Sequence, residues 1–186
     1  MHLMLLLGAI FNSFLFTRPS VGAASKTVSW DPKRINELGW TDAHMVAYGW
    51  PIRTADGDEI FISPESHQMT SFLSDATNEF LCLQNDFGQT ALHLAVRQDY
   101  RELVSFLVLA RKVPCLDVGN RDGDTPLHYA AAWGRAESAE VLLQGGADMK
   151  LRNHHGNTPM DDALTFGHQD VYSLMEAAHK VIEKEL

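Results

Sequence analysis

One eight-residue pattern occurs three times in the chain, and it constrains the fold more than any other feature of the sequence. The copies begin at Gly88, Gly123 and Gly156 and read GQTALHLA, GDTPLHYA and GNTPMDDA. Their glycines are 35 and 33 positions apart, and apolar residues at helical spacing follow each copy. A period of roughly 20 to 50 residues indicates stacked units, because one helix pair cannot bury its apolar face alone.

Within each copy, the residue types predict a tight turn followed by a helix. Glycine suits a turn whose backbone conformation disfavours a Cβ. Thr125 and Thr158 can cap a helix, and Pro126 and Pro159 suit the first helical position, where a missing N–H is harmless. We therefore expect helix pairs joined by turns.

The pattern Gly-x-Thr-Pro-Leu-His-x-Ala at a 33-residue period resembles the ankyrin repeat, and residues 121–152 follow that consensus closely. Ala91 replaces proline in the first copy, Asp161 replaces histidine in the third, and two residues are inserted near 111–114. Such drift suits capping units with a polar outer face. The resemblance implies an all-α repeat solenoid of helix-turn-helix units with loops like β-hairpins. It also implies structural roles for these repeat positions: Thr90, His93, Thr125, His128 and Thr158.

A fourth, degenerate copy is expected upstream, beginning at Gly39, where glycine, threonine and histidine recur at the same spacing with about 16 extra residues in the unit. Asp56-Gly57, flanked by isoleucines, predicts a hairpin. The sequence SPE at 63–65 predicts the start of a helix that runs to about residue 75. This helix is expected to bury Met69, Phe72 and Leu73.

Residues 1–24 read as a cleavable secretory signal, since an apolar core is followed by proline and small residues. The core is too short to span a bilayer comfortably. Two alternatives remain: an uncleaved anchor, which would be the only link to a membrane, and a mis-assigned start codon. The predicted location is secreted or periplasmic, with cytoplasmic as the alternative. The predicted units are the signal at 1–24, a joining segment at 25–38, a degenerate repeat at 39–87, repeats at 88–122 and 123–155, and a C-terminal capping repeat at 156–186.

The formal net charge of −9, from 15 basic and 24 acidic residues, argues against nucleic-acid binding, which needs cations to neutralise phosphates. The same balance favours a protein partner with a basic face. Two cysteines, Cys82 and Cys115, allow one disulfide in an exported chain. We favour two unpaired, half-buried side chains, and the disulfide is the alternative.

His154 and His155 are the best candidates for metal chemistry, with Asp122 as a possible third ligand. A catalytic zinc site needs three converging protein ligands, and nothing in the pattern fixes that third one. The carboxylates Asp124, Asp161 and Asp162 lie at helix starts and turns, where the helix dipole favours negative charge. We therefore expect no enzyme, no cofactor and no metal, and a metal-dependent enzyme using these three residues is the less favoured alternative.

In the ankyrin family, partners dock on the loop tips and on the exposed side of each first helix. The resemblance maps this surface to Phe87, Gln89, Arg97, Arg121, Asp122, Asp124, Trp133, His154, His155, Asn157 and Phe166, and to Trp40 and Tyr48 if the upstream copy is real. Trp133 is the main candidate; the alternative is that it packs between first helices.

The predicted function is that of a monomer that binds, inhibits or stabilises another protein. Its type would be an immunity or accessory protein in a bacterium, or an effector in a parasite or symbiont. An intracellular scaffold is the alternative if the leader is not real.

Overall fold

The structure is a computed structural model that describes residues 39–53, 59–63, 69, 73–74 and 76–184 of the 186-residue chain. The predicted signal at 1–24 and the joining segment at 25–38 lie outside the described residues. The elements are α2 (Asp42–Tyr48), β1 (Ile52–Arg53), β2 (Glu59–Ile60), α4 (Asn78–Leu81), α5 (Ala91–Gln98), α6 (Arg101–Ser105), the π-helix η1 (Phe106–Ala110), α7 (Pro126–Ala132), α8 (Ala136–Gln144), α9 (Pro159–Phe166) and α10 (Gln169–Lys184).

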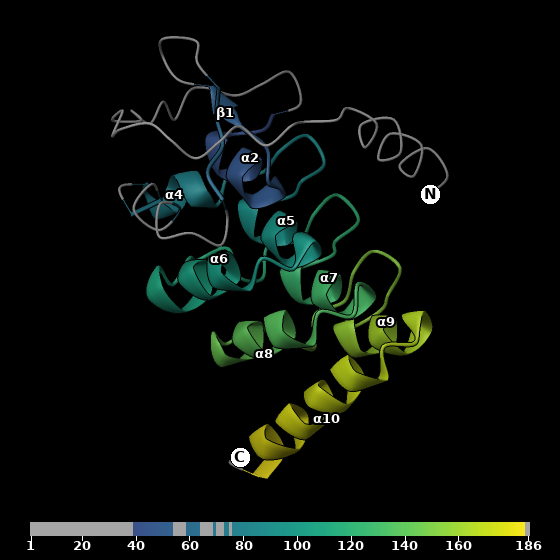
Figure 1. The fold of residues 1–186 in the computed structure, drawn as a ribbon. Coiled ribbons are helices and arrows are strands. Elements are labelled where there is room, and N and C mark those ends of the chain that lie inside the picture. Colours follow the sequence, from purple (N-terminus) through teal and green to yellow (C-terminus); the bar gives the residue numbers. More distant parts are fainter. Residues whose placement is uncertain (1–38, 54–58, 64–68, 70–72, 75, 185–186) are drawn as a thin grey trace.

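The helices stack in two rows (Figure 1). In the first row α2, α5, α7 and α9 pack one on the next, and in the second row α6, α8 and α10 do the same. The loops that lead into α5, α7 and α9 project from the same side of the stack (Figure 1). The predicted all-α repeat solenoid is therefore confirmed.

Each helix of the first row begins with the same reciprocal cap. A threonine at the N-cap receives a hydrogen bond within the first turn, and the third helical residue accepts one from the backbone N–H of that threonine. The threonines are Thr41, Thr90, Thr125 and Thr158. The third helical residue is His44, His93, His128 or, in the last unit, Asp161. Asp161 can replace histidine in the cap because a carboxylate is also a hydrogen-bond acceptor.

Gly88 and Gly123 have to be glycine for two reasons. Their φ angles are 73° and 78°, in the left-handed region. In addition, a Cβ at Gly88 would lie 2.7 Å from the backbone nitrogen of Arg121, and one at Gly123 would lie 3.0 Å from that of His154. Gly156 shares the conformation, with φ of 82°, but a Cβ there would meet nothing within 4 Å. The glycines thus let each loop lie directly against the next.

The two inserted residues near 111–114 are accommodated by a wider helical turn. The Arg111 N–H donates to the carbonyl of Phe106 at 2.8 Å, five residues back, and the Val113 N–H donates to the carbonyl of Leu107 at 3.2 Å. Lys112 then adopts a φ of 50°, which is uncommon for a residue with a side chain. This π-helical turn keeps Leu107 buried while the chain becomes two residues longer.

Cys82 and Cys115 form a disulfide, so the preferred interpretation of unpaired cysteines was wrong. Their separation of 33 residues matches the repeat period, which places the two side chains at the same level of adjacent units. The Cα atoms are 5.5 Å apart, as a disulfide requires. At the next junction a hydrogen bond lies at the corresponding place, from the Asp148 N–H to the Asp117 carboxylate at 3.0 Å.

The part of the chain upstream of α5 contains the predicted hairpin. β1 and β2 pair antiparallel, with Ile52 opposite Ile60. Met69 and Leu73 are helical and buried, as expected, whereas Phe72 lies outside the described residues. No helix within the described residues combines the length and the apolar character needed to span a bilayer.

Candidate protein-binding surface

Three histidines join α2, α5 and α7 to the following unit from inside the fold. The Nε2 atom of His44 lies 2.8 Å from the carbonyl oxygen of Gln89. His93 and His128 make the same contact, at 3.0 Å, with the carbonyl oxygens of Asp124 and Asn157. These contacts are structural, because all three imidazole rings are buried between units.

The protonation of these rings follows from their partners. The Thr90 N–H donates to Nδ1 of His93 at 3.1 Å, so Nδ1 carries no proton and Nε2–H is the donor to the carbonyl. Burial lowers the pKa of His93 from 6.5 to about 4, and it lowers the pKa of His44 by the same amount. Both rings are therefore neutral hydrogen-bonding groups at pH 7.

Gln89 was predicted to face a partner, and the structure contradicts this. Gln89 is only 5% exposed, and its side-chain amide donates to the Tyr129 hydroxyl at 2.6 Å. The Asn120 amide donates to the same hydroxyl at 3.2 Å. Tyr129 thus connects two units, a role that the sequence analysis missed because its repeat position carries other residues in the neighbouring copies. Trp40, also expected at the surface, is buried and stacks on Trp50 with ring centroids 5.1 Å apart.

Asp124 and Asn157 are likewise largely engaged inside the loops. The Asn153 amide donates to the Asp124 carboxylate at 2.8 Å, and the Asn157 amide donates to the Asp162 carboxylate at 2.9 Å. Burial raises the pKa of Asp162 above its usual value. Both predicted residues are half-buried, and their side chains hold adjacent loops together.

The predicted residues that remain at the surface include three large aromatic side chains. Trp133 is 48% exposed, Phe166 56% and Phe87 36%. Trp133 directly follows α7, and Phe166 ends α9, one repeat later. The Arg97 guanidinium lies over the Trp133 ring, 5.2 Å from its centroid. We call Phe87, Arg97, Trp133 and Phe166 the aromatic surface. With 48% of it exposed and Arg97 over its ring, Trp133 is partly covered by the stack and partly accessible to a partner.

The loop tips carry the other predicted residues. Arg121, Asp122, His154 and His155 are exposed. The His154 N–H donates to the carbonyl of Asp122 at 2.8 Å, so the proximity of these residues is a backbone contact between loops. Within the described residues, no group of three His, Cys, Asp or Glu side chains is placed to hold a metal ion.

Comparisons with known proteins agree with this architecture. A family model described as ankyrin repeats in three copies matches residues 66–153 and 115–184. The chain is 34% identical over 93 residues to protein phosphatase 1 regulatory subunit 12A of Mus musculus, a match that covers 50% of the chain and 8% of that protein. It is 33% identical over 105 residues to Rabankyrin-5 of Mus musculus, covering 51% of the chain and 9% of that protein.

A third relative, the E3 ubiquitin-protein ligase Ufd4 of Drosophila melanogaster, is 32% identical over 118 residues, or 62% of the chain and 4% of that protein. The chain therefore spans less than a tenth of the length of these relatives.

The ankyrin fold is generally a protein-interaction module without catalytic activity. With capped helix pairs, interlocked loops and a family model that matches more than half of its residues, the chain belongs to the ankyrin-repeat family.

Proposed function

We propose that the chain is an exported, non-enzymatic module that binds one protein partner through the aromatic surface and the adjoining loop tips, and thereby inhibits or stabilises that partner. The observation that carries the proposal is the Arg97–Trp133 pair. A half-exposed tryptophan at the C-terminal end of α7 has a guanidinium 5.2 Å from its ring centroid.

This pair has the features of an interface anchor. Tryptophan and arginine are the residues that most often dominate the free energy of protein association. A cation–π contact restrains both side chains before a partner arrives, which reduces the entropy lost on binding. Phe166, at the corresponding position one repeat later, and Phe87, in the loop before α5, offer further exposed apolar side chains, so the partner is expected to present apolar groups.

Charge supports a partner that also carries basic groups. The chain has a net charge of −9, and Asp86 and Asp122 are exposed close to the aromatic surface. Opposite charge on the partner would accelerate encounter and align the two surfaces. We expect the association rate to fall as ionic strength rises, because salt screens charges that lie more than about 10 Å apart.

Export is supported by two independent features. Residues 1–24 have the composition of a secretory signal, and Cys82 is bonded to Cys115. Disulfides persist in oxidising compartments and are rare in the cytosol. Mass spectrometry of the protein purified from its own host tests this part of the proposal. A chain that begins near residue 24 or 25 and lacks free thiols is expected; an intact N-terminus with two free thiols would contradict export.

The binding proposal is tested by affinity capture from the host's extract with the chain that lacks residues 1–24. The variant Trp133→Ala is compared with wild type, and Val181→Ala serves as the matched control, because Val181 is 56% exposed on α10, away from the aromatic surface. We expect the control to capture the same partner as wild type. Trp133→Ala is expected to bind about 30-fold more weakly, the effect of losing about 2 kcal/mol at an interface anchor.

Thermal melts of both variants separate binding from folding. Trp133→Ala should melt close to wild type, because the side chain it shortens is half-exposed. Equal capture by wild type and a fully folded Trp133→Ala protein would show that the partner uses another surface. A large loss of melting temperature with unchanged affinity would assign Trp133 to the stability of the stack instead.

A further inference from the structure

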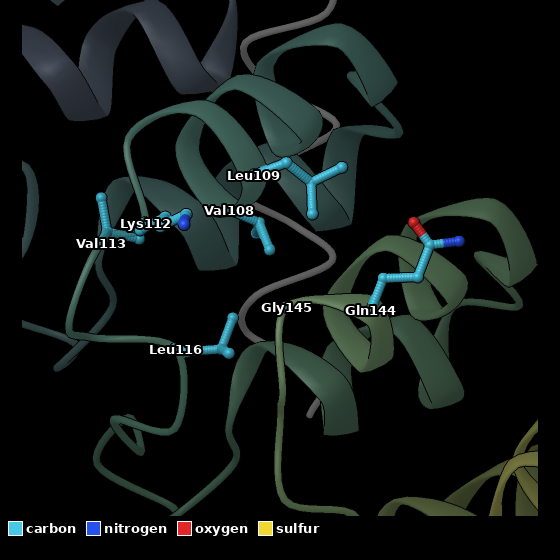
Figure 2. Close-up of a pocket in the computed structure, with 7 residues that line it drawn as sticks. All are labelled: Val108, Leu109, Lys112, Val113, Leu116, Gln144 and Gly145. Carbon is cyan, nitrogen blue, oxygen red and sulfur yellow. The ribbon is translucent and has the colours of Figure 1, made fainter.

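A pocket lies beside the two-residue insertion, and a second pocket lies at the corresponding place one unit later, between the end of α8 and α10. The first pocket has a volume of about 320 Å³ and lies where the end of η1 meets the end of α8. Figure 2 shows the side chains that line it. It belongs to the second row of helices, whereas the aromatic surface lies on the first row and the loops.

The walls of the pocket are partly aliphatic and partly polar, since Lys112 and Gln144 line it together with four aliphatic side chains. Val108 and Val113 are buried, Leu116 is half-buried, and Leu109 is exposed at the rim. In Figure 2 the Leu116 side chain points toward Val108 and Gly145. Gly145 lies close to Val108 on one side of the pocket: a Cβ at Gly145 would be 2.3 Å from a methyl carbon of Val108.

One cation lines this pocket. Lys112 lies at the edge of the pocket with Val108 and Val113 among the other lining residues (Figure 2), and it is exposed to solvent. Lys112 makes no ion pair or hydrogen bond through its ammonium within the described residues, and it is held at a φ of 50°. A side chain in this conformation is uncommon, and backbone strain that a fold maintains is concentrated at functional sites.

The surroundings hold Lys112 and the walls in place. Cys115 lies between the two lining residues Val113 and Leu116, and its bond to Cys82 fixes that segment to the preceding unit. On the other side of Lys112, the Arg111 guanidinium donates to the carbonyls of Ser74 and Ala76. The pocket is therefore preorganised, which is what a small ligand needs to bind without ordering the chain.

We propose that this pocket binds a small aliphatic carboxylate, with its chain between Val108 and Leu116 and its carboxylate at the Lys112 ammonium. A volume of 320 Å³ corresponds to about ten water molecules at ~30 Å³ each, and hence to a ligand of about eight to ten non-hydrogen atoms. This is near the lower limit of ligand pockets. Such a volume holds the whole of hexanoate, and a charged ammonium selects a carboxylate over a neutral or cationic group.

The test is titration of the folded chain with hexanoate, followed by methyl chemical shifts in NMR spectra. Hexan-1-ol and hexylamine are the matched probes without the negative charge. We expect hexanoate to shift the methyl signals of Val108, Val113 and Leu116, with a dissociation constant on the order of a millimolar. The alcohol should bind about five- to tenfold more weakly, and the amine more weakly still. Equal binding of hexanoate and hexan-1-ol would overturn the proposal.

Lys112→Gly separates ligand binding from folding. Glycine relieves the left-handed backbone, so this variant should melt at a higher temperature than wild type while it loses the preference for hexanoate. Lys112→Arg keeps the charge and should retain binding. Unchanged hexanoate affinity in Lys112→Gly would refute the role of the ammonium. Binding of a peptide that ends in a leucine carboxylate, without binding of hexanoate, would likewise refute a small-molecule site.

Trp133→Ala shows whether the two proposals stand separately. This substitution removes the anchor of the aromatic surface and should leave hexanoate binding unchanged, because the pocket is on the other row of helices. Loss of hexanoate binding in the folded Trp133→Ala chain would contradict the location of the pocket.

Discussion

Mild acid should lower the free energy of unfolding of this protein through two buried histidines. His44 and His93 are neutral in the folded chain, with pKa values lowered from 6.5 to about 4, chiefly by burial. In the unfolded chain both return to about 6.5. Between these two values the unfolded state binds more protons than the folded state, so stability falls as pH falls from about 6.5 to about 4. Well above pH 6.5, where the ring is neutral in both states, neither histidine contributes a pH dependence.

The magnitude follows from the two pKa values. At pH 5 the unfolded form of each histidine is almost fully protonated and the folded form is mostly neutral, which costs about 2 kcal/mol per histidine. Two such residues lower the free energy of unfolding by about 4 kcal/mol between pH 7 and pH 5. A domain of this kind is stabilised by about 5–15 kcal/mol in total, so the loss is a large fraction. Protonation of Asp162 acts in the opposite direction, because its pKa is raised in the folded state.

Guanidinium unfolding at pH 7, 6 and 5, followed by far-UV circular dichroism, measures this loss directly. The variant His93→Ala should lower stability at pH 7 and should also reduce the difference between pH 7 and pH 5 from about 4 to about 2 kcal/mol. The exposed pair His154 and His155, both changed to glutamine, is the control and should keep the wild-type difference. The reasoning is refuted if His93→Ala shows the same difference as wild type.

Three further predictions concern the stability of the stack, and guanidinium unfolding tests each of them. Replacing Cys82 and Cys115 by serine opens a loop of 33 residues and should lower the free energy of unfolding by about 3–4 kcal/mol; an unchanged midpoint would show that the bond restrains nothing in the unfolded chain. Gly88→Ala should be more destabilising than Gly156→Ala by at least about 1 kcal/mol. Both strain a left-handed residue, but only the first places a Cβ against backbone, and equal losses would contradict this account. Tyr129→Phe should lower stability by about 1–3 kcal/mol, because the buried Gln89 amide and the half-buried Asn120 amide lose their shared acceptor; a loss below a few tenths would mean that water replaces the hydroxyl.

The periodic part of the fold could be read from the sequence because its signals are local. A glycine, a threonine cap and a first-turn proline each act within a few residues, and together they recur at nearly the same spacing. The hairpin at Ile52 and Ile60 was predicted from a similarly local signal, the sequence DG between apolar residues, although the turn itself lies outside the described residues.

The features that could not be predicted depend on contacts between units. Gln89 lies next to a loop tip in sequence, but the Tyr129 hydroxyl, 40 residues away, draws its amide into the interior. The disulfide needs two Cβ atoms in adjacent units to face each other, which composition does not reveal. The inserted residues near Lys112 follow a π-helical turn and do not form a longer loop, and both outcomes fit the same sequence.

The disulfide also makes the two ends of the described stack unequal. Stacked-repeat proteins open from their ends, because each unit is held only by its neighbours. At the junction before α5 a covalent bond prevents separation of the neighbouring units, whereas the α9–α10 unit is joined to its neighbour by non-covalent contacts alone. Local opening should therefore start at α9 and α10, and amide hydrogens there should exchange fastest. Phe166 lies in that unit, so a partner that contacts Phe166 would slow hydrogen exchange along the whole of α10.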